Sequence, residues 1–328
     1  MSRTEPETTT TGSRSWHSRS VGSRLQHGIF YLLIHLGGRR AAYVLLHLVV
    51  AYYALLRPDL RRRGEPYLRR RFPEASPREL FRHGCRLLLD FGKVLVDRAV
   101  VGILGPERMT VRLHGREELL ALLAEGKGLI LIGAHVGCWQ AAMSALGFLS
   151  TPVSLLMQRE DGDIDRHYFE HAGRQCPYRI IDPRGFLGGS LEMLAVLKRG
   201  EVLSVMGDRL LGSDKNAVTV DFLGGPVHLP FSAYKLAATT GAPIAVLFSA
   251  KTGPASYELE LAKVIRVPAV AGRNGAAFAP YVAEFAVALE KFTRDHPYQF
   301  FNFFDMWQND ETKSLNGEEF HIWTSKNS

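Results

Sequence analysis

Short apolar runs alternate with amphipathic stretches from about residue 109 to residue 250. The runs hold almost no charge, which is typical of strands buried on both faces of a parallel sheet, and the stretches between them have helical spacing. The pattern predicts an α/β fold with a mostly parallel central sheet flanked by helices. The expected strands are 128–134, 151–157, 178–181, 201–207 and 243–250, and the expected helices are 139–148, 163–175, 188–199 and 231–240.

Two longer apolar runs precede this region. Residues 41–56 carry no formal charge unless His47 is protonated, and residues 28–36 form the other run. At about 1.5 Å per residue, the longer run spans roughly 24 Å, which is less than the roughly 30 Å of bilayer hydrocarbon. Because residues 37–40 (Gly-Gly-Arg-Arg) interrupt the two runs, we expect a monotopic or short membrane anchor, with a buried core helix as the alternative.

The chain is basic, with a net charge of +7, and its arginines gather beside the apolar run. Seven of them lie between residues 57 and 71, opposed there by Asp59 and Glu65. Such a cluster suits an anionic membrane surface or an acidic carrier protein, although a solvated helix face is the plainer interpretation. No nucleic-acid motif accompanies it, so we expect no nucleic-acid partner. The arginines expected to contact the membrane are Arg39, Arg40, Arg61, Arg62 and Arg63.

The expected organisation has four parts. Residues 1–24 are a disordered tail, 25–72 the membrane-associated element, 73–312 the α/β domain and 313–328 a C-terminal tail. The α/β domain opens with an amphipathic helix from Pro77 to about Val101.

Several kinds of site are excluded by motif. The three cysteines are widely spaced without a CxxC pair, which argues against disulfides and structural zinc and fits a reducing compartment. Phosphate-binding loops, a dinucleotide fingerprint and a GxSxG nucleophile elbow are missing from the sequence. We therefore expect no metal and no bound cofactor.

Candidate chemistry lies where the predicted strands end, since active sites of parallel sheets gather at the carboxyl ends of strands. His135 follows the first strand, Arg159 the second, and Asp208 and Arg209 the fourth. An imidazole with a pKa near 6.5 can take a proton from an attacking hydroxyl near neutral pH. Taken alone, His135 is as compatible with a structural role.

Three ordered blocks carry a resemblance to a known family. GLILIGAHVGCWQAAM looks like the HxxxxD/E motif, and KRGEVLSVMGDRLLGSDKNAVTVDFLGGPVHLP and TTGAPIAVLF follow it in order. Together they resemble the bacterial lipid A biosynthesis (late) acyltransferase family, within the glycerolipid acyltransferase superfamily. GRRAAYVLLHLVVAYYALLRPDLRRR looks like its membrane-facing element, and HPYQFFNFFDMW occupies the place of its terminal aromatic strand. The resemblance covers roughly residues 28–310.

The resemblance implies a membrane-associated acyltransferase at the cytoplasmic face of a bacterial inner membrane. It would move a fatty acyl group from acyl carrier protein or coenzyme A to a hydroxyl or amine of lipid A or another amphiphile, with the acyl thioester as co-substrate. It implies His135 as general base, Asp208 as an acid in the same cleft and Arg159 as a binding group. Arg209, next to Asp208, is a further candidate for substrate binding, and Trp139, close to His135, is a candidate for the wall of the acyl channel. The structural alternatives are a surface arginine at 159, a helix cap at 208 and simple packing at 139.

One position departs from the family motif. Gln140 stands where the motif ends in Asp or Glu, five residues after His135. A carboxylate there would hold the imidazole tautomer and stabilise the imidazolium, whereas an amide gives little charge stabilisation. Asp208 could supply the charge instead, the acceptor could be a stronger nucleophile, or the chain could be a degenerate acyltransferase that binds lipid or carrier protein in an aryl-polyene or glycolipid assembly. Finally, the aromatic run Phe300–Phe304 is expected to be a core strand rather than a tunnel wall.

Overall fold

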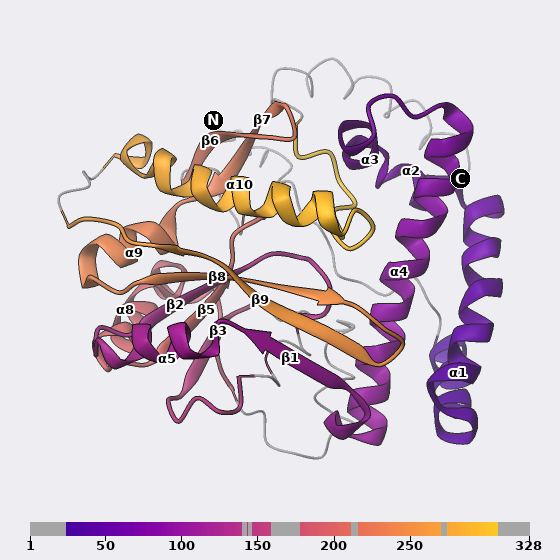
Figure 1. Ribbon diagram of the computed structural model, residues 1–328, viewed down its shortest axis with the longest axis horizontal. Coiled ribbons are helices and arrows are strands. Elements are labelled where there is room, and N and C mark those ends of the chain that lie inside the picture. The colour runs from indigo at the N-terminus through magenta and orange to yellow at the C-terminus, as the bar shows by residue number, and fades with distance from the viewer. Residues whose placement is uncertain are drawn as a thin grey trace, which may run out of the picture.

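Seven described strands form one sheet in the order β1-β9-β8-β2-β5-β3-β4, in which β8 and β9 pair antiparallel and every other neighbouring pair is parallel. This computed structural model describes residues 24–139, 143, 146–158, 178–210, 216–269 and 274–307 (Figure 1). The prediction of a mostly parallel α/β fold is confirmed. The strands are β1 Thr110–His114, β2 Leu129–Gly133, β3 Val153–Leu156, β4 Tyr178–Ile181, β5 Val202–Met206, β8 Ile244–Lys251 and β9 Ser256–Ile265.

Alternate residues of the central strands enter two different cores. Along β2, Leu129 and Leu131 join a cluster with α5, while Ile130 and Ile132 join a larger cluster with α8, α9 and α10. Both faces of the sheet are therefore covered, which explains why the strands read as unbroken apolar runs. The covering helices are α5 Arg116–Ala124, α8 Ser190–Lys198, α9 Ser232–Thr240 and α10 Ala279–Asp295.

The five strands and two of the helices expected from the apolar pattern are present close to their predicted bounds. The segment 163–175 lies outside the described residues, and 139–148 is described only in part. Four strands and two helices were not predicted. These are β1, β9, the hairpin of β6 (Ala217–Phe222) and β7 (Gly225–Pro230), α5 and α10.

The two N-terminal apolar runs are joined in one helix, α1 (Arg24–Leu56), which is kinked at Gly38 with φ 62° and ψ −161°. The predicted interruption is thus a kink rather than a break. Gly28–Leu56 is long and apolar enough to cross a membrane by length and composition, and only 17% of its apolar window is buried. The outer face exposes Leu36, Val44, Leu48, Leu55 and Leu56.

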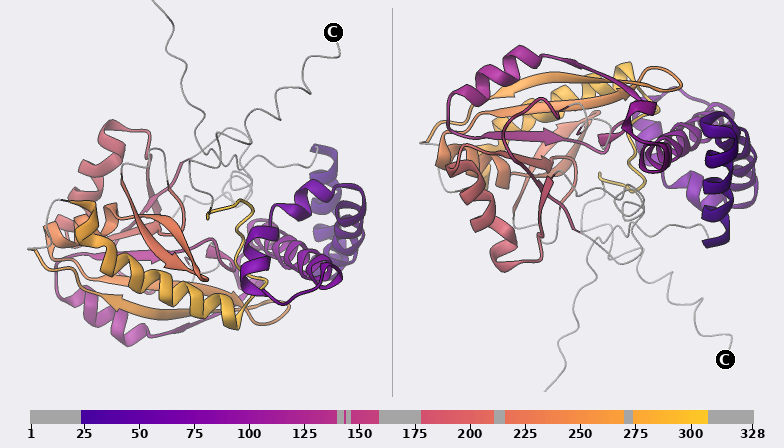
Figure 2. Two further views of the ribbon diagram at one scale, coloured as in Figure 1. Left: turned by 90° about the horizontal axis from the view of Figure 1, so that it is seen from above. Right: turned by 90° about the horizontal axis from the view of Figure 1, so that it is seen from below.

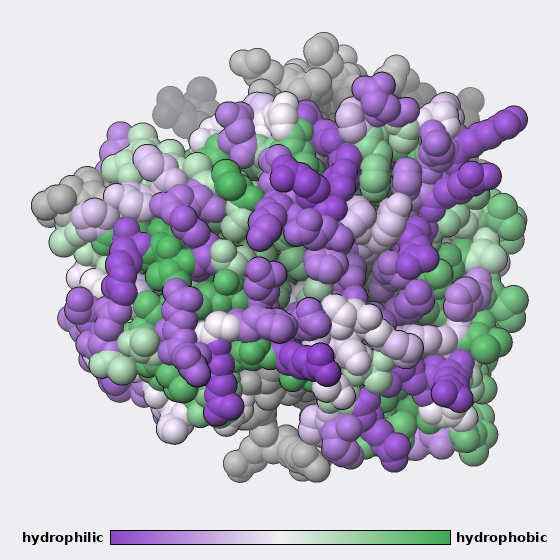
Figure 3. Space-filling model, viewed as in Figure 1, coloured by the Kyte–Doolittle hydropathy of each residue, from purple (hydrophilic) through white to green (hydrophobic). Residues whose placement is uncertain are grey.

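The inner face of α1 packs on α4 (Pro77–Leu104), and the two helices lie together at one side of the layered sheet domain (Figure 2). Ile34, Ala42 and Leu46 of α1 meet Val96 and Val100 of α4 in a small separate core. Space-filling atoms coloured hydrophobic lie along the edge of the molecule that α1 occupies (Figure 3). The short helices α2 (Pro58–Arg62) and α3 (Glu65–Arg71) connect the pair.

A buried carboxylate fastens α1 and α4 to the sheet. Asp97 of α4 is 0% exposed and accepts hydrogen bonds from Arg39 Nε (2.7 Å) and Tyr43 Oη (2.7 Å) of α1. Lys251 Nζ of β8 and Tyr257 Oη of β9 each donate to its other oxygen at 2.6 Å. Two cations and two hydroxyls satisfy this carboxylate, as burial of a charge requires.

The aromatic run near the C-terminus is buried but does not form the predicted strand. Phe300 makes one antiparallel bridge with Val136, and the residues from Phe301 to Trp307 are irregular. The prediction of a core strand is wrong, because this backbone bonds to the loop after β2 instead of to a neighbouring strand.

Candidate active site

Strand register brings His135 and Asp208 together. Gly133 and Met206 are paired residues at the carboxyl ends of the neighbouring strands β2 and β5. The Gly207 amide donates to the Gly133 carbonyl at 2.8 Å, which extends the pairing one step beyond the strands. Each candidate residue lies two positions past its strand end, so the parallel register sets their side chains beside one another.

The carboxylate holds the imidazole at Nδ1. Both Asp208 oxygens lie 3.0 Å from His135 Nδ1, and Oδ2 also accepts from the His135 backbone amide at 3.2 Å. The side chain of Asp208 is 1% exposed, whereas that of His135 is 35% exposed. A carboxylate can only accept, so the contact favours the tautomer with a proton on Nδ1 and a lone pair on Nε2.

Arg209 is the third polar residue of this cluster. Its Nε lies 3.8 Å from Asp208 Oδ2, and its Nη2 donates to the Phe301 carbonyl at 2.6 Å. The guanidinium also stacks over the Phe304 ring at 5.5 Å. These contacts hold the guanidinium in place, and only 11% of the side chain is exposed. Arg209 therefore places a positive charge at the edge of the site.

The electrostatics leave a neutral base beside an ionised acid. Burial and the charge of Arg209 lower the pKa of His135, and together they outweigh the opposite influence of Asp208. Burial would raise the pKa of Asp208, but its contacts with His135 and the charge of Arg209 hold the pKa below its usual value. At neutral pH the imidazole is therefore free to accept a proton at Nε2.

A backbone frame fixes the loop that carries His135. The Phe301 amide donates to the His135 carbonyl at 2.8 Å, and the Gly137 amide donates to the Gln299 carbonyl at 3.0 Å. Gly137 has φ +50°, and a Cβ atom there would overlap the Ser249 carbonyl of β8. This position needs glycine for both its conformation and the close approach of β8.

Gln299 links the same frame to the Asp97 cluster. Its side-chain oxygen accepts from the Lys251 amide at 2.7 Å and its side-chain nitrogen donates to the Lys251 carbonyl at 2.9 Å. Lys251 in turn donates from Nζ to Asp97. A continuous set of contacts thus runs from α1 to the loop of His135.

Of the other predicted site residues, Trp139 is described by the structure and two are not. Trp139 is partly buried and packs against the cluster that contains Leu119 and Leu131, so its acyl-channel role stays a prediction. Gln140 and Arg159 lie outside the described residues. Within the described part of the chain, no group of three or more His, Cys, Asp or Glu side chains could hold a metal ion.

The five arginines expected at the membrane differ in how exposed their side chains are. Arg39 turns inward to Asp97 and to the Arg108 carbonyl, with 14% of its side chain exposed. Arg61 is partly buried and stacks on the Phe81 ring at 5.0 Å. The side chains that remain at the surface are those of Arg40, Arg62 and Arg63.

Sequence reasoning missed Asp97, Gln299 and the backbone of Phe301. Asp97 interrupts the apolar face of an amphipathic helix, which is the one signal that could have marked it as a buried, paired charge. Gln299 and Phe301 act through backbone or amide groups, for which no sequence pattern exists.

Comparison with known proteins shows the family of the chain. Residues 28–309 match the family model of bacterial lipid A biosynthesis acyltransferase. None of the curated proteins compared with the chain matches it. Because the family model covers most of its length, the chain belongs to this family of acyltransferases.

Proposed function

We propose that this member of the lipid A biosynthesis acyltransferase family transfers a fatty acyl group from an acyl thioester to a hydroxyl or amine of lipid A or another membrane amphiphile. The donor would be acyl carrier protein or coenzyme A, and the reaction would take place at the cytoplasmic face of the inner membrane. The observation that carries the proposal is the contact of His135 with a buried carboxylate at the strand ends.

In the proposed reaction, His135 is the general base. Nε2 takes the proton of the acceptor hydroxyl while its oxygen attacks the thioester carbonyl carbon, and a tetrahedral oxyanion forms. The C–S bond then breaks and the sulfur leaves with the proton from Nε2. The products are an ester, or an amide from an amine acceptor, and the free carrier thiol. Arg209, and Arg159 by resemblance, would hold negative charge on the substrates.

Asp208 fills the role that Gln140 leaves open. The family motif implies a carboxylate for the base, and Asp208 contacts Nδ1 with both oxygens. It is buried and ionised, so it can select the tautomer and stabilise the imidazolium that forms during attack. Of the three explanations for Gln140, this one is supported by a direct contact between Asp208 and His135, and it favours catalysis over a purely binding role.

The test is acyl transfer by the purified chain in detergent, with acyl carrier protein and coenzyme A thioesters offered against a membrane lipid extract. Wild type, His135→Ala and Gln140→Glu are compared, with His114→Ala as a matched control because His114 is a surface histidine on β1. Labelled lipid product that disappears only in His135→Ala supports the proposal. Equal transfer by His135→Ala contradicts the general-base role, and activity gained only in Gln140→Glu indicates a degenerate binding protein.

A further inference from the structure

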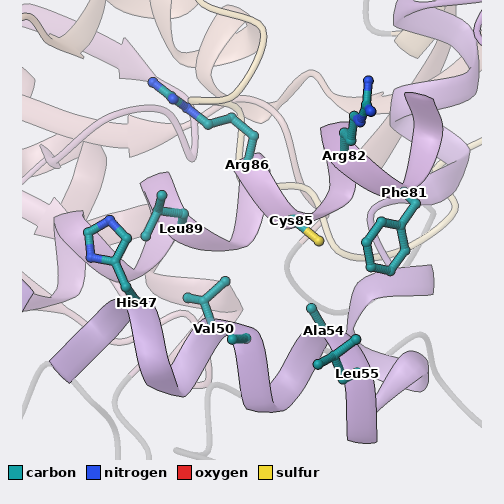
Figure 4. A pocket seen from close by; sticks show the side chains of 10 residues that line it. His47, Val50, Ala54, Leu55, Phe81, Arg82, Cys85, Arg86 and Leu89 are labelled. Atoms are coloured by element: carbon teal, nitrogen blue, oxygen red, sulfur yellow. The ribbon is translucent and has the colours of Figure 1, made fainter. Parts of the chain in front are cut away.

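An apolar groove of about 490 Å³ runs between α1 and α4, outside the candidate active site (Figure 4). Both helices contribute side chains to its walls, and together they leave a trough open to the surface. Its apolar lining includes Val50, Ala51, Ala54, Phe81, Cys85 and Leu89.

The groove exists because α1 and α4 contact each other closely at one point and leave space between them further along. Leu46 sits against Gly92 so closely that a Cβ atom on Gly92 would overlap the leucine side chain. Beyond this close contact, the short side chain of Ala54 leaves space opposite Phe81 and Cys85, and Ala51 also lines this space. The two alanines of α1 therefore help to leave the trough open.

Positive charge borders the α4 side of the groove. Arg82 and Arg86 line it from positions one helical turn apart, both are exposed, and Figure 4 shows both guanidinium groups directed away from α1 at the rim. His47 stands at the opposite side, on α1. This arrangement places cations where the headgroup of a lipid would lie if its chain filled the trough.

The nearby carboxylates do not cancel this charge. Glu79 is committed to the N-terminal cap of α4, where it accepts from the amide and hydroxyl of Ser76. Asp90 pairs with Arg86 at 3.1 Å but is shared with Lys93, also at 3.1 Å. Around the groove, the described acidic groups are thus fewer than the cations and already engaged.

The groove also adjoins the exposed apolar face of α1. Leu48 is 67% exposed and Leu55 is 71% exposed, and Leu55 is itself part of the lining. A soluble acidic partner would leave this face uncovered, whereas a bilayer covers it at the same time as it supplies a chain and a phosphate. Apolar lining, basic rim and apolar surroundings together fit one kind of occupant.

We propose that this groove is a binding site for a single anionic glycerophospholipid, with one acyl chain between α1 and α4 and the phosphate on Arg82 and Arg86. The site is separate from His135 and needs no acyl transfer. It holds the N-terminal pair of helices on the membrane through a defined lipid as well as through general surface charge.

The experiment measures lipid bound to the full-length chain in neutral detergent by native mass spectrometry, with dioleoyl phosphatidylglycerol and dioleoyl phosphatidylcholine as probes. Arg82→Glu/Arg86→Glu removes the phosphate contacts, and Arg112→Glu/Lys127→Glu makes the same charge change on exposed residues outside the groove. Ala51→Phe fills the trough without changing charge. His135→Ala is included because it separates this site from catalysis.

The expected result is selective retention of phosphatidylglycerol by wild type, the surface control and His135→Ala. Affinity should fall about tenfold or more in Arg82→Glu/Arg86→Glu, since both cations that would contact the phosphate are replaced by anions. Ala51→Phe should lose the lipid as well. Equal retention of phosphatidylcholine, unchanged binding in both groove variants, or equal binding of the chain-free glycerophosphoglycerol headgroup would overturn the proposal.

Discussion

Replacing Asp208 with asparagine tests the site most directly. Asparagine keeps the size of the side chain but has one acceptor oxygen in place of two. In the structure, Oδ2 accepts from the His135 amide at 3.2 Å and lies 3.8 Å from Arg209 Nε, and both of these groups are donors. They favour the single oxygen on their side, so the new NH₂ group faces His135 Nδ1.

That orientation reverses the imidazole tautomer. Nδ1 must then accept, the ring proton moves to Nε2, and the lone pair needed by the attacking hydroxyl is lost. The equivalent change in a serine protease triad costs about 10⁴ in turnover, so we expect a loss of about 10³- to 10⁴-fold in Asp208→Asn. At 1.36 kcal/mol for each factor of ten, this is roughly 4–5.5 kcal/mol of transition-state stabilisation.

Single-turnover transfer at saturating acceptor measures this effect on the chemical step. Asp182→Asn is the matched control, because Asp182 is an exposed aspartate that pairs with Arg184 away from the site. Thermal unfolding of each variant separates misfolding from a tautomer effect. A rate for Asp208→Asn within tenfold of wild type, in a folded protein, would refute the assignment and return the question to Gln140.

The pH profile gives an independent reading of the same pair. A protonated His135 cannot act as a base, and burial with Arg209 lowers its pKa. The acid limb of kcat/KM should therefore have its midpoint below about 6.5. Removing the Arg209 charge in Arg209→Met should move that midpoint to higher pH, whereas Asp208→Asn should move it lower. Shifts in the same direction for both variants would contradict the charge assignment.

Three further predictions concern the frame around the site and the membrane contact. Asp97→Ala leaves two cations without their buried partner, so it should lower the free energy of unfolding, measured by urea titration, by about 3–5 kcal/mol. The control Asp221→Ala changes an exposed aspartate and should lower the free energy of unfolding by less than about 0.5 kcal/mol. Gly137→Ala should lower kcat, since relief of the overlap with the Ser249 carbonyl moves the loop of His135. A kcat equal to that of wild type, measured by stopped-flow assay, would count against this expectation. Charge reversal at Arg62 and Arg63 should release the chain from anionic vesicles in flotation assays, and unchanged flotation would disprove a role for these surface arginines.

The sequence predicts the central strands because their environment is uniform. Both faces of β2, β5 and β8 are covered by helices, so these strands read as short apolar runs bounded by turns. β1 alternates exposed and half-buried residues at a sheet edge, and β9 mixes charged with apolar positions beside it. Their weaker patterns explain why they were missed, although the fold class did not depend on them.

The site itself was predictable in part. His135 and Asp208 were recognised because each follows a strand end, but the sequence gives no strand order, and β3 and β4 intervene between β2 and β5 along the chain. Only the adjacency of β2 and β5 turns two candidates into a hydrogen-bonded pair. The same limit applies to Asp97, whose partners Arg39 and Lys251 lie 58 and 154 residues away.

This adjacency also changes the meaning of Gln140. Read along the chain, the motif has lost its acid, since the family places a carboxylate five residues after the histidine. In three dimensions, Nδ1 already has a buried carboxylate from the neighbouring strand end, held in place by Arg209 and by the His135 amide. An imidazole has only one Nδ1, so an acid at 140 would have to compete with Asp208 for it or act elsewhere. Gln140→Glu should therefore leave the acyl-transfer rate within about tenfold of wild type, and a rate increase of about 10³-fold would show that Asp208 does not replace the missing acid.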